Sequence, residues 1–451
     1  MLRLKRMKPS YLVLGIGIAL AASGSLSAAP ARTDGAPPGS SIPYVATRND
    51  AVRDMLYLAD VGKDDVVYDL GSGDGRIVIA AVRDFGARRA VGIEIDPERV
   101  RASIESAQKA GVADRVKFIQ GDLFTNDFSQ ATVLTLFLGH EPNLRLRPRI
   151  FSTLKPGTRV VSHQYAMGEW QPDKALTVRT VYLGMWGEQY NPFGDNPRVP
   201  DYSANERHYG TSDRIAVWVV PAAVAGIWRS TVETAQGAQD FQLVLHQRLS
   251  EVAGSFEIAG QTNLAGRVHA DVWGDHVRYE CEPDHLPYGQ FQLKFDGHIR
   301  NETMQGTLSV YDHGQHRERA WEAQRAKADP TGTWEWPAAM GTHSVRLRIE
   351  GPEGHRIATY LDREETVPVT DFYDYGGGLY FTHMIGREGN SIRGDPDTGW
   401  LIGEAVADHG ALKGKIEFYP YHNVMLGPLS GRKEAPTEPI IRDWTPQLVK
   451  P

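Results

Sequence analysis

The sequence predicts an α/β domain built on a mostly parallel sheet, followed by an all-β region. Between residues 43 and 222, short and almost wholly apolar runs alternate with amphipathic segments, which is typical of a parallel sheet covered by helices on both faces. The last two apolar runs of this part are joined by a polar stretch instead of a helix, which favours an antiparallel edge hairpin. After residue 223 the helical pattern stops, and short alternating runs separated by Gly, Asp and Pro follow.

Length and charge limit the classes of protein to consider. A chain of 451 residues exceeds the roughly 250 to 300 residues at which a single core stops growing, so several domains are expected. The net charge of −7 argues against a broad electrostatic surface for nucleic acid, and we expect no nucleic-acid partner. The single cysteine, Cys281, excludes an intrachain disulfide and a multi-cysteine metal site. We therefore expect a packed thiol and no metal.

The first 31 residues have the features of a secretory signal peptide. Residues 1–10 carry four basic side chains and no acid, and the apolar run Tyr11–Ala22 follows. This run is shorter than the roughly 20 residues that cross a membrane. We expect a cleaved signal peptide at 1–31, a linker at 32–42 and a mature protein exported to the bacterial periplasm. The alternatives are an uncleaved anchor, through which alone the chain would touch the membrane, and a misassigned start.

The α/β domain, residues 43–222, is predicted from apolar periodicity and from helix start signals. The strands are expected at Val66–Leu70, Ala90–Ile95, Val116–Gln120, Val133–Leu138 and Arg159–His163, with an edge hairpin of Leu176–Met185 and Arg214–Val220. The helices are expected at Asn49–Val61, Arg76–Phe85, Pro97–Ala110 and Asn143–Leu154. The polar stretch Trp186–Asp213 is long enough for a lid or a substrate platform, with disorder as the alternative.

The all-β region is predicted to be a duplication, with repeats at 223–328 and 329–435 and a tail at 436–451. Gly226-Ile-Trp228 recurs as Gly332-Thr-Trp334 at an offset of 106 residues. Met304-Gln-Gly-Thr-Leu-Ser-Val-Tyr311 recurs as Leu412-Lys-Gly-Lys-Ile-Glu-Phe-Tyr419 at an offset of 108 residues. Two matches at nearly one offset indicate duplication. The Gly-x-Trp opening resembles the start of lipocalin-like barrels, and a β-sandwich or one larger shared barrel are the alternatives.

A glycine-rich motif joins the first strand to the following helix and reads Asp69-Leu-Gly71-Ser72-Gly73-Asp74-Gly75. Its glycines let the backbone approach a ligand at the strand end, where helix N–H groups point. A dinucleotide site would use the same turn for a diphosphate. Here, however, Ser72 and Asp74 crowd the turn and Asp69 precedes it, which suits the ammonium group of a methionine moiety better.

Acidic residues also follow the next two strands. The second strand ends with Glu94, where a ribose diol would lie, and Ile95 is assigned to the same site. After the third strand, Asp122 is placed to meet an adenine amino group and Leu123 to meet the face of the ring. Acids at the ends of three consecutive strands predict a site for a nucleoside-containing cofactor, the alternative being that each acid only caps the next helix or turn.

At this point the sequence resembles the class I S-adenosylmethionine (SAM) methyltransferases over about residues 43–221. Further segments resemble the bacterial relatives of the mitochondrial lysine methyltransferases that modify the c-ring protein of ATP synthase and, more distantly, the non-SET histone lysine methyltransferases. These segments are Pro43-Tyr44-Val45, Asp69–Val78, Gly92–Pro97, and Arg159-Val-Val-Ser162 with Trp170. The resemblance implies SAM as cofactor, with Tyr44 and Thr47 covering its methionine end. It also implies N-methylation of a protein lysine or of another amine, including that of a small molecule.

Methyl transfer from a sulfonium needs an aligned, neutral nucleophile more than a dedicated base. Glu141 and Asn143 follow the fourth strand and are candidates for orienting an amine, and His163, at the end of the fifth strand, is a candidate for accepting its proton. The alternatives are that Asn143 only caps a helix and that His163 only ends a strand.

A second functional hypothesis is an exported binding protein that keeps the methyltransferase fold as an idle scaffold. The expected location favours this hypothesis, because SAM is made in the cytoplasm. The presence of Asp69, Glu94 and Asp122 favours the enzyme.

Overall fold

The structure is a computed structural model that describes residues 42–179, 212–234, 236–287, 289–336, 345–361, 366–385, 399–408, 411–420, 440–444 and 447–449. Two compact units are distinguished, Met1–Tyr44 and Val45–Pro451, and the second holds every helix and strand given below. The predicted signal peptide, nearly all of the linker and most of Trp186–Asp213 lie outside the described residues. No helix within the described ranges combines the length and the apolar character that a membrane crossing requires.

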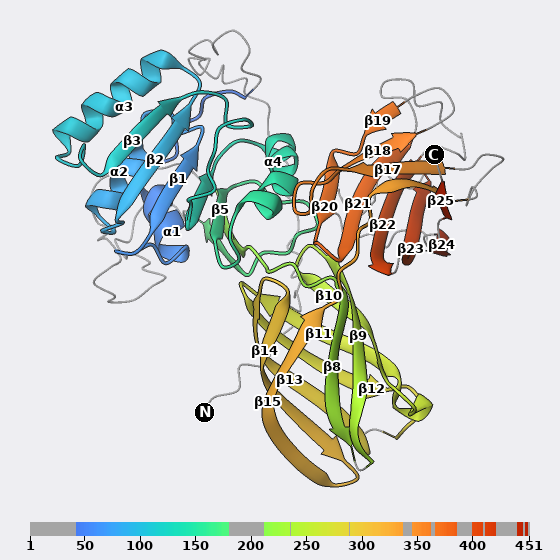
Figure 1. The fold of residues 1–451 in the computed structure, drawn as a ribbon. Coiled ribbons are helices and arrows are strands. Elements are labelled where there is room, and N and C mark those ends of the chain that lie inside the picture. The colour runs from blue at the N-terminus through green and yellow to red at the C-terminus, as the bar shows by residue number, and fades with distance from the viewer. Residues whose placement is uncertain are drawn as a thin grey trace, which may run out of the picture. The chain divides into compact units, whose positions relative to one another are not determined.

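Seven strands form one mixed sheet in the order β3-β2-β1-β4-β5-β7-β6 (Figure 1). The first five strands are parallel, and β7 runs antiparallel to both β5 and β6, which confirms the predicted parallel sheet with an antiparallel edge hairpin. The strands are β1 (Val66–Leu70), β2 (Arg89–Glu94), β3 (Val116–Gln120), β4 (Val133–Leu136), β5 (Arg159–His163), β6 (Lys174–Arg179) and β7 (Ser212–Val219). The helices are α1 (Asn49–Leu58), α2 (Arg76–Arg83), α3 (Pro97–Lys109) and α4 (His140–Thr153).

Local sequence explains where these elements begin. All five residues of β1 are buried, as expected of a central strand with both faces covered. At the start of α3 the Asp96 carboxylate accepts the Glu98 N–H at 2.9 Å and Pro97 occupies the first turn, as predicted. The expected start of α4 at Asn143 was wrong, because the helix begins at His140. Pro142 is tolerated there since the first turn of a helix leaves its N–H groups without intrahelical partners.

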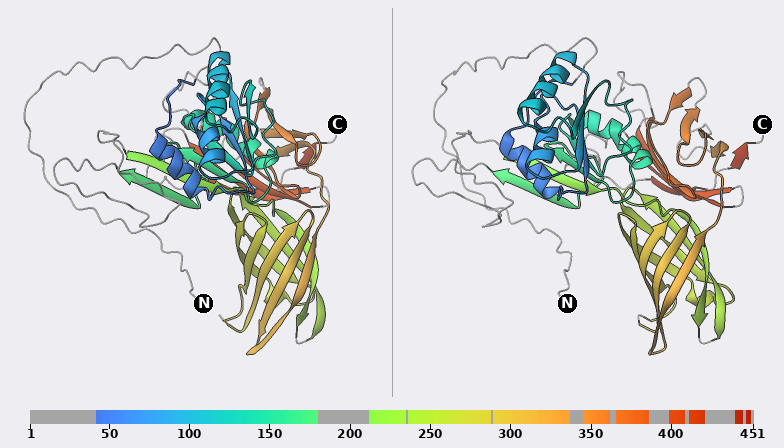
Figure 2. Two further views of the ribbon diagram at one scale, coloured as in Figure 1. Left: turned by 90° about the vertical axis from the view of Figure 1, so that its left-hand side faces the viewer. Right: turned by 60° about the vertical axis from the view of Figure 1, so that its left-hand side comes forward.

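Eight antiparallel strands after this sheet close into a barrel of their own, in the order β10-β11-β12-β13-β14-β15-β8-β9 (Figure 2). Inward-facing side chains fill the barrel, with the Trp321 ring 5.3 Å from Phe295 and 6.1 Å from Tyr279. Cys281 is a buried free thiol in this core, as expected. A β-sandwich or a barrel shared with the later strands is wrong for this part. The strands are β8 (Gly226–Thr234), β9 (Gly237–Arg248), β10 (Glu251–Ile258), β11 (Gly266–Trp273), β12 (His276–Pro283), β13 (Phe291–Arg300), β14 (Thr303–Asp312) and β15 (Gln315–Arg325), with a 3-10 turn η1 (Thr262–Leu264).

The remaining strands form two five-stranded antiparallel sheets, ordered β19-β18-β17-β16-β25 and β20-β21-β22-β23-β24. We call this part the C-terminal β unit. Its buried core includes Trp334, Tyr360 and Phe381. The strands are β16 (Gly332–Trp336), β17 (Val345–Glu350), β18 (Ile357–Leu361), β19 (Thr366–Pro368), β20 (Asp371–Asp374), β21 (Gly378–Ile385), β22 (Gly399–Asp408), β23 (Ala411–Pro420), β24 (Ile440–Trp444) and β25 (Gln447–Val449).

Candidate functional site

Asp69, the last residue but one of β1, lies at the centre of the candidate site. Its neighbours in register are Gly92 of β2 and Thr135 of β4. The carboxylate is 3% exposed and accepts the Thr135 hydroxyl at 2.6 Å. Burial raises the pKa of Asp69 to about 7, the hydrogen bond from Thr135 works in the opposite direction, and the Glu94 and Asp74 carboxylates raise it further. A positive group placed beside this acid would favour its charged form.

The glycine turn satisfies its own backbone donors. The N–H groups of Gly71 and Ser72 both donate to the Ile93 carbonyl, at 2.8 and 3.0 Å. The Gly73 N–H donates to Glu94 Oε2 at 2.9 Å. These donors are therefore not left over for a diphosphate, which in a dinucleotide site is held by such N–H groups.

Two glycines of the turn have different reasons to lack a side chain. Gly71 has a φ of +76°, and an added Cβ would lie 2.8 Å from Leu138 Cδ2 and 4.0 Å from Leu123 Cδ2. The predicted Leu123 thus borders the turn, together with a leucine that sequence reasoning missed. Gly75 has a φ of +78°, and its Cβ would lie 2.6 Å from the Phe118 ring. Gly75 therefore serves packing against β3, whereas Gly71 packs against the two leucines.

Glu94 links the ends of β1 and β2. Its side chain is 6% exposed, and its two oxygens accept the N–H groups of Gly73 and Asp96 at 2.9 and 3.0 Å. Ile95, the next residue, is 38% exposed. The structure thus brings the predicted ribose-binding acid to the glycine turn.

Asp122 follows β3 and is exposed. Its Oδ1 accepts the Phe124 N–H at 2.8 Å, so the side chain also stabilises its own turn, as the capping alternative predicts. The Arg149 guanidinium of α4 donates to the Asn126 carbonyl at 2.6 Å, which ties this loop to α4. The Gly121 N–H donates to the Glu94 carbonyl at 2.9 Å, so the ends of β2 and β3 meet as predicted.

The residues assigned to the methionine end precede α1. Thr47 is 5% exposed, and its carbonyl accepts Arg76 Nη1 at 2.6 Å. Arg76 also binds both oxygens of Asp74, through Nε at 2.9 and 3.1 Å. Sequence reasoning missed this arginine, which connects Thr47 to the glycine turn. Tyr44 is 39% exposed.

Asn143 lies in the first turn of α4 and is fully buried. Its amide nitrogen donates to Ser162 Oγ at 3.1 Å and to the Tyr165 carbonyl at 3.2 Å. Asn143 Oδ1 has no hydrogen-bond partner among the described residues. The predicted helix-capping alternative is wrong, because Gly139 is the N-cap.

His163 and Glu141, the other two catalytic candidates, differ in exposure. His163 ends β5, is 4% exposed and has its ring centroid 4.2 Å from that of Phe137. Phe137 also lies 6.1 Å from the ring of Tyr165, so three rings gather after β4 and β5. Glu141 is exposed in the first turn of α4.

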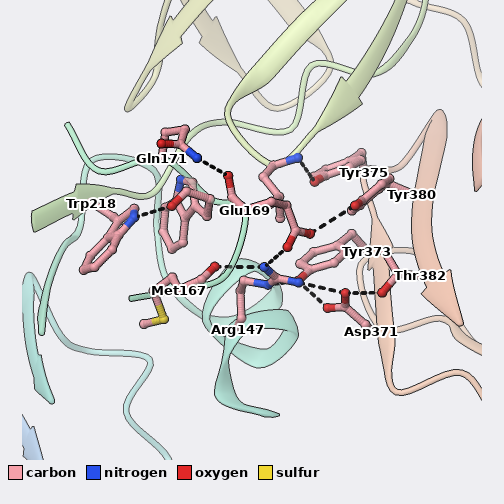
Figure 3. Close-up of polar contacts among 12 residues, drawn as sticks. Arg147, Met167, Glu169, Gln171, Trp218, Asp371, Tyr373, Tyr375, Tyr380 and Thr382 are labelled. Carbon is pink, nitrogen blue, oxygen red and sulfur yellow. Dashed lines mark hydrogen bonds and ion pairs between the residues drawn. The ribbon is translucent and has the colours of Figure 1, made fainter. Parts of the chain in front are cut away.

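Arg147 of α4 is the centre of a buried polar cluster that sequence reasoning missed (Figure 3). The side chain is 1% exposed. It donates to the Tyr373 hydroxyl at 2.6 Å, to the Met167 carbonyl at 2.8 Å, to Glu169 Oε2 at 2.9 Å and to Asp371 Oδ2 at 2.7 Å. Two of these partners lie more than 220 residues away in sequence, so no local pattern could indicate the cluster.

Known proteins resemble about a third of the chain. A family model described as the ANTKMT methyltransferase domain matches residues 69–174. A protein-lysine N-methyltransferase of Saccharolobus islandicus (strain REY15A) is 46% identical over 153 residues, which make up 33% of this chain and 95% of that protein.

A mammalian protein is also similar. The adenine nucleotide translocase lysine N-methyltransferase of Mus musculus is 32% identical over 158 residues. The match covers 35% of this chain and 66% of that protein, so the chain spans slightly less than two thirds of this relative.

Among solved structures, an RNA methyltransferase from Salinibacter ruber in complex with S-adenosyl-L-homocysteine is 44% identical. The match covers 39% of this chain and 93% of that chain, with a TM-score of 0.31.

Proposed function

The chain belongs to the family of SAM-dependent methyltransferases with the ANTKMT methyltransferase domain, and we propose that it transfers the methyl group of SAM to a lysine side chain of a protein. The observation that carries this proposal is the buried Asp69 carboxylate at the sheet edge where Glu94 binds the glycine turn, with the Glu94 charge raising the pKa of Asp69. The lysine acceptor is supported by the names of the archaeal and the mouse relative, both of which are lysine N-methyltransferases.

The residues at the strand ends fit SAM by the chemistry of their side chains. Asp69 would accept the ammonium group of the methionine moiety, and Glu94 would accept the ribose hydroxyls. Asp122 would accept a hydrogen bond from the adenine amino group, and the adenine ring would lie between the apolar side chains of Ile95 and Leu123. The N–H groups of the turn already donate hydrogen bonds within the protein, so the ligand is expected to be held by these side chains and not by the turn N–H groups. Tyr44 and Thr47 are proposed to cover the methionine end.

The acceptor side is proposed to lie at the ends of β4, which neighbours β1 in the sheet, and of β5, which neighbours β4. SAM supplies an electrophilic methyl group, and transfer breaks its bond to sulfur while a bond to the amine nitrogen forms. Asn143 Oδ1 would accept an N–H of the incoming amine and so orient its lone pair. His163 would take up the proton that the amine loses, and the exposed Glu141 would attract a lysine that arrives charged.

The test is methyl transfer from radiolabelled SAM to peptides that are acetylated at the N-terminus and each carry one unmodified lysine. Matched peptides with arginine in place of lysine, and an RNA oligonucleotide, serve as controls. We expect label in the lysine peptides alone, recovered as methylated lysine after hydrolysis. Label in the RNA alone, or in none of these acceptors while SAM binds, would contradict the lysine proposal.

The Asn143→Ala variant tests the acceptor side directly. Loss of an orienting hydrogen bond should lower kcat about 100-fold, the size of effect that misplacement of a reacting group produces. SAM affinity, measured by calorimetry, should stay unchanged, because Asn143 is not assigned to the cofactor. Equal losses in SAM affinity and in kcat would remove Asn143 from the acceptor site.

We also propose that the protein is exported, which is supported by the basic and apolar pattern of residues 1–31. A fusion of residues 1–40 to a reporter that is active only outside the cytoplasm should be active, and a silent fusion would contradict export. Export of an idle scaffold is the less supported function, because the acids of the predicted site are present and two of them are buried together.

Duplication of the β region is supported by equivalent details in the two repeats. Trp228 and Trp334 each donate from Nε1 to the carbonyl four residues earlier, at 2.9 and 2.8 Å. Gly226 and Gly332, which precede these tryptophans, have φ values of +133° and +131°. In addition, β15 pairs with β8, the first strand of the first repeat, and β25, which lies in the predicted tail, pairs with β16, the first strand of the second repeat.

A further inference from the structure

The loop after β5, residues 164–170, is held against α4 at two points. Asn143 donates to the Tyr165 carbonyl, and Arg147 donates to the Met167 carbonyl. Because residues four apart lie on one face of a helix, the two side chains bind successive parts of the same loop. The loop begins at Gln164, whose φ is +68°, so the chain turns sharply as β5 ends.

Arg147 is fitted closely to this loop. Gly168 has a φ of +64°, and an added Cβ there would lie 2.7 Å from Arg147 Nη1. Glu169 accepts Arg147 Nη1 at 2.9 Å through one oxygen and the Tyr380 hydroxyl at 3.1 Å through the other. A shift of the guanidinium would therefore move the loop or leave the partly buried Glu169 without its cation, which is costly.

The position of Arg147 is in turn set by β20 and β21. Its Nη2 donates to Asp371 Oδ2, and its Nε donates to the Tyr373 hydroxyl. That hydroxyl donates to Asp371 Oδ1 at 2.6 Å, and the Thr382 hydroxyl donates to Asp371 Oδ2 at 2.5 Å. Figure 3 shows these side chains converging on Arg147. All three nitrogens of the guanidinium are thereby occupied, two of them by the C-terminal β unit.

We propose that β20 positions the loop 164–170 through Arg147, and that the C-terminal β unit thereby determines the geometry of the methyl-acceptor site. This inference rests on the proposed function, because the loop carries Tyr165 and follows His163. Arg147 is a positioning residue, since it contacts the loop and β20 but none of the residues assigned to the cofactor. The Tyr165 ring, 41% exposed, is the surface that the loop presents beside Phe137.

The experiment compares two neighbouring tyrosines that each make buried hydroxyl contacts. Tyr373→Phe removes the hydroxyl between Arg147 and Asp371. Tyr375→Phe is the matched control, because its hydroxyl accepts the Leu249 N–H at 3.1 Å. Three quantities are measured in the full chain: SAM affinity, amide hydrogen exchange in residues 164–170, and kcat and KM for the N-terminally acetylated peptide with one unmodified lysine.

We expect Tyr373→Phe to raise the KM for the peptide about three- to tenfold, the equivalent of one lost hydrogen bond, and to speed exchange in residues 164–170 by a similar factor. SAM affinity should not change. Tyr375→Phe should leave the KM and the loop exchange as in the wild type, whatever it does to stability. Asp371→Asn should act in the same direction as Tyr373→Phe and more strongly.

The proposal is overturned if Tyr373→Phe changes loop exchange no more than Tyr375→Phe does. It is also overturned if SAM affinity falls together with the peptide KM effect, because a general loss of structure would do that. Should the wild type transfer no methyl group to the peptide, the lysine proposal fails, while the exchange measurement still decides whether β20 holds the loop.

Discussion

Two groups of carboxylates in this molecule each contain one acid with a shifted pKa, and the two shifts run in opposite directions. At the ends of β1 and β2, Asp69 is buried beside Glu94, and burial raises its pKa to about 7. Around Arg147, burial also pushes the pKa of Glu169 upward, but the Arg147 charge and hydrogen bonds outweigh it and leave that pKa below its usual value. An added cation would favour the charged form of Asp69, whereas Glu169 already has the Arg147 cation beside it.

This difference separates a ligand site from a structural site by physical chemistry alone. A buried acid without a cation costs stability and is retained when a ligand uses it. A buried acid with a complete set of donors holds parts of the chain together. The comparison predicts that changes in the first group affect SAM binding and that changes in the second affect stability and the acceptor loop.

Removal of the arginine should have the largest effect. Arg147→Met leaves the partly buried Glu169 and Asp371 without the Arg147 cation, so we expect the free energy of unfolding to fall by about 3 kcal/mol. Chemical denaturation monitored by tryptophan fluorescence measures this loss. Arg145→Ala, on the same helix but exposed over the Phe124 ring, is the control and should cost less than about 1 kcal/mol. Equal losses in the two variants would show that the cluster is no more than a surface contact.

Removal of the Asp69 charge should affect SAM binding instead of stability. We expect Asp69→Asn to weaken SAM binding about 100-fold, the equivalent of one charge-assisted hydrogen bond lost in a buried site. A raised folded-state pKa means that the ligand-free protein loses stability as pH rises from about 4 to about 7, so the asparagine variant should be at least as stable at about pH 8. Calorimetry and denaturation at that pH test both halves. Loss of stability with unchanged SAM affinity would reverse the assignment.

A comparison of two glycines with positive φ, Gly75 in the turn and Gly86 outside it, separates the cost of tight packing from the cost of backbone conformation. Gly75→Ala should destabilise by about 2–3 kcal/mol, because the new Cβ would meet the Phe118 ring and φ is positive. Gly86, with a φ of +72° and no heavy atom within 4 Å of an added Cβ, should cost only about 1 kcal/mol when changed to alanine. Thermal unfolding measures both. Similar values would mean that Phe118 yields easily and that Gly75 has no special packing role.

The α/β sheet could be predicted from the sequence because its signals are local. The central strands β1 and β4 are short, mainly apolar runs, and Gly71, Gly73 and Gly75 mark the turn after β1. Asp69 and Glu94 could be assigned together because parallel neighbouring strands bring their ends to one edge. The start of α4 was missed because Pro142 breaks the apolar pattern although a helix accepts proline in its first turn.

The Arg147 cluster could not be predicted, because it depends on pairs that are distant in the chain. Arg147 lies in a helix with Arg145 and Arg149, and nothing in the sequence distinguishes the buried arginine from its neighbours. Likewise, closure of the barrel rests on two residue pairs between β15 and β8, about 95 residues apart. Thr135 was missed for a smaller reason, since its role follows only from its register beside Asp69.

The pH dependence of SAM binding tests the central claim most directly, that Asp69 is a buried acid kept for the ammonium group of SAM. Because Asp69 titrates at about 7 and must be ionised to bind a cation, affinity should rise roughly eightfold from about pH 6 to about pH 7.5. Calorimetric titration of the full chain at these two pH values, with Asp69→Asn alongside, measures it. The account predicts this rise in the wild type and its disappearance in the variant. A wild-type affinity that stays constant or falls over this range, or a variant that keeps the rise, would contradict the account.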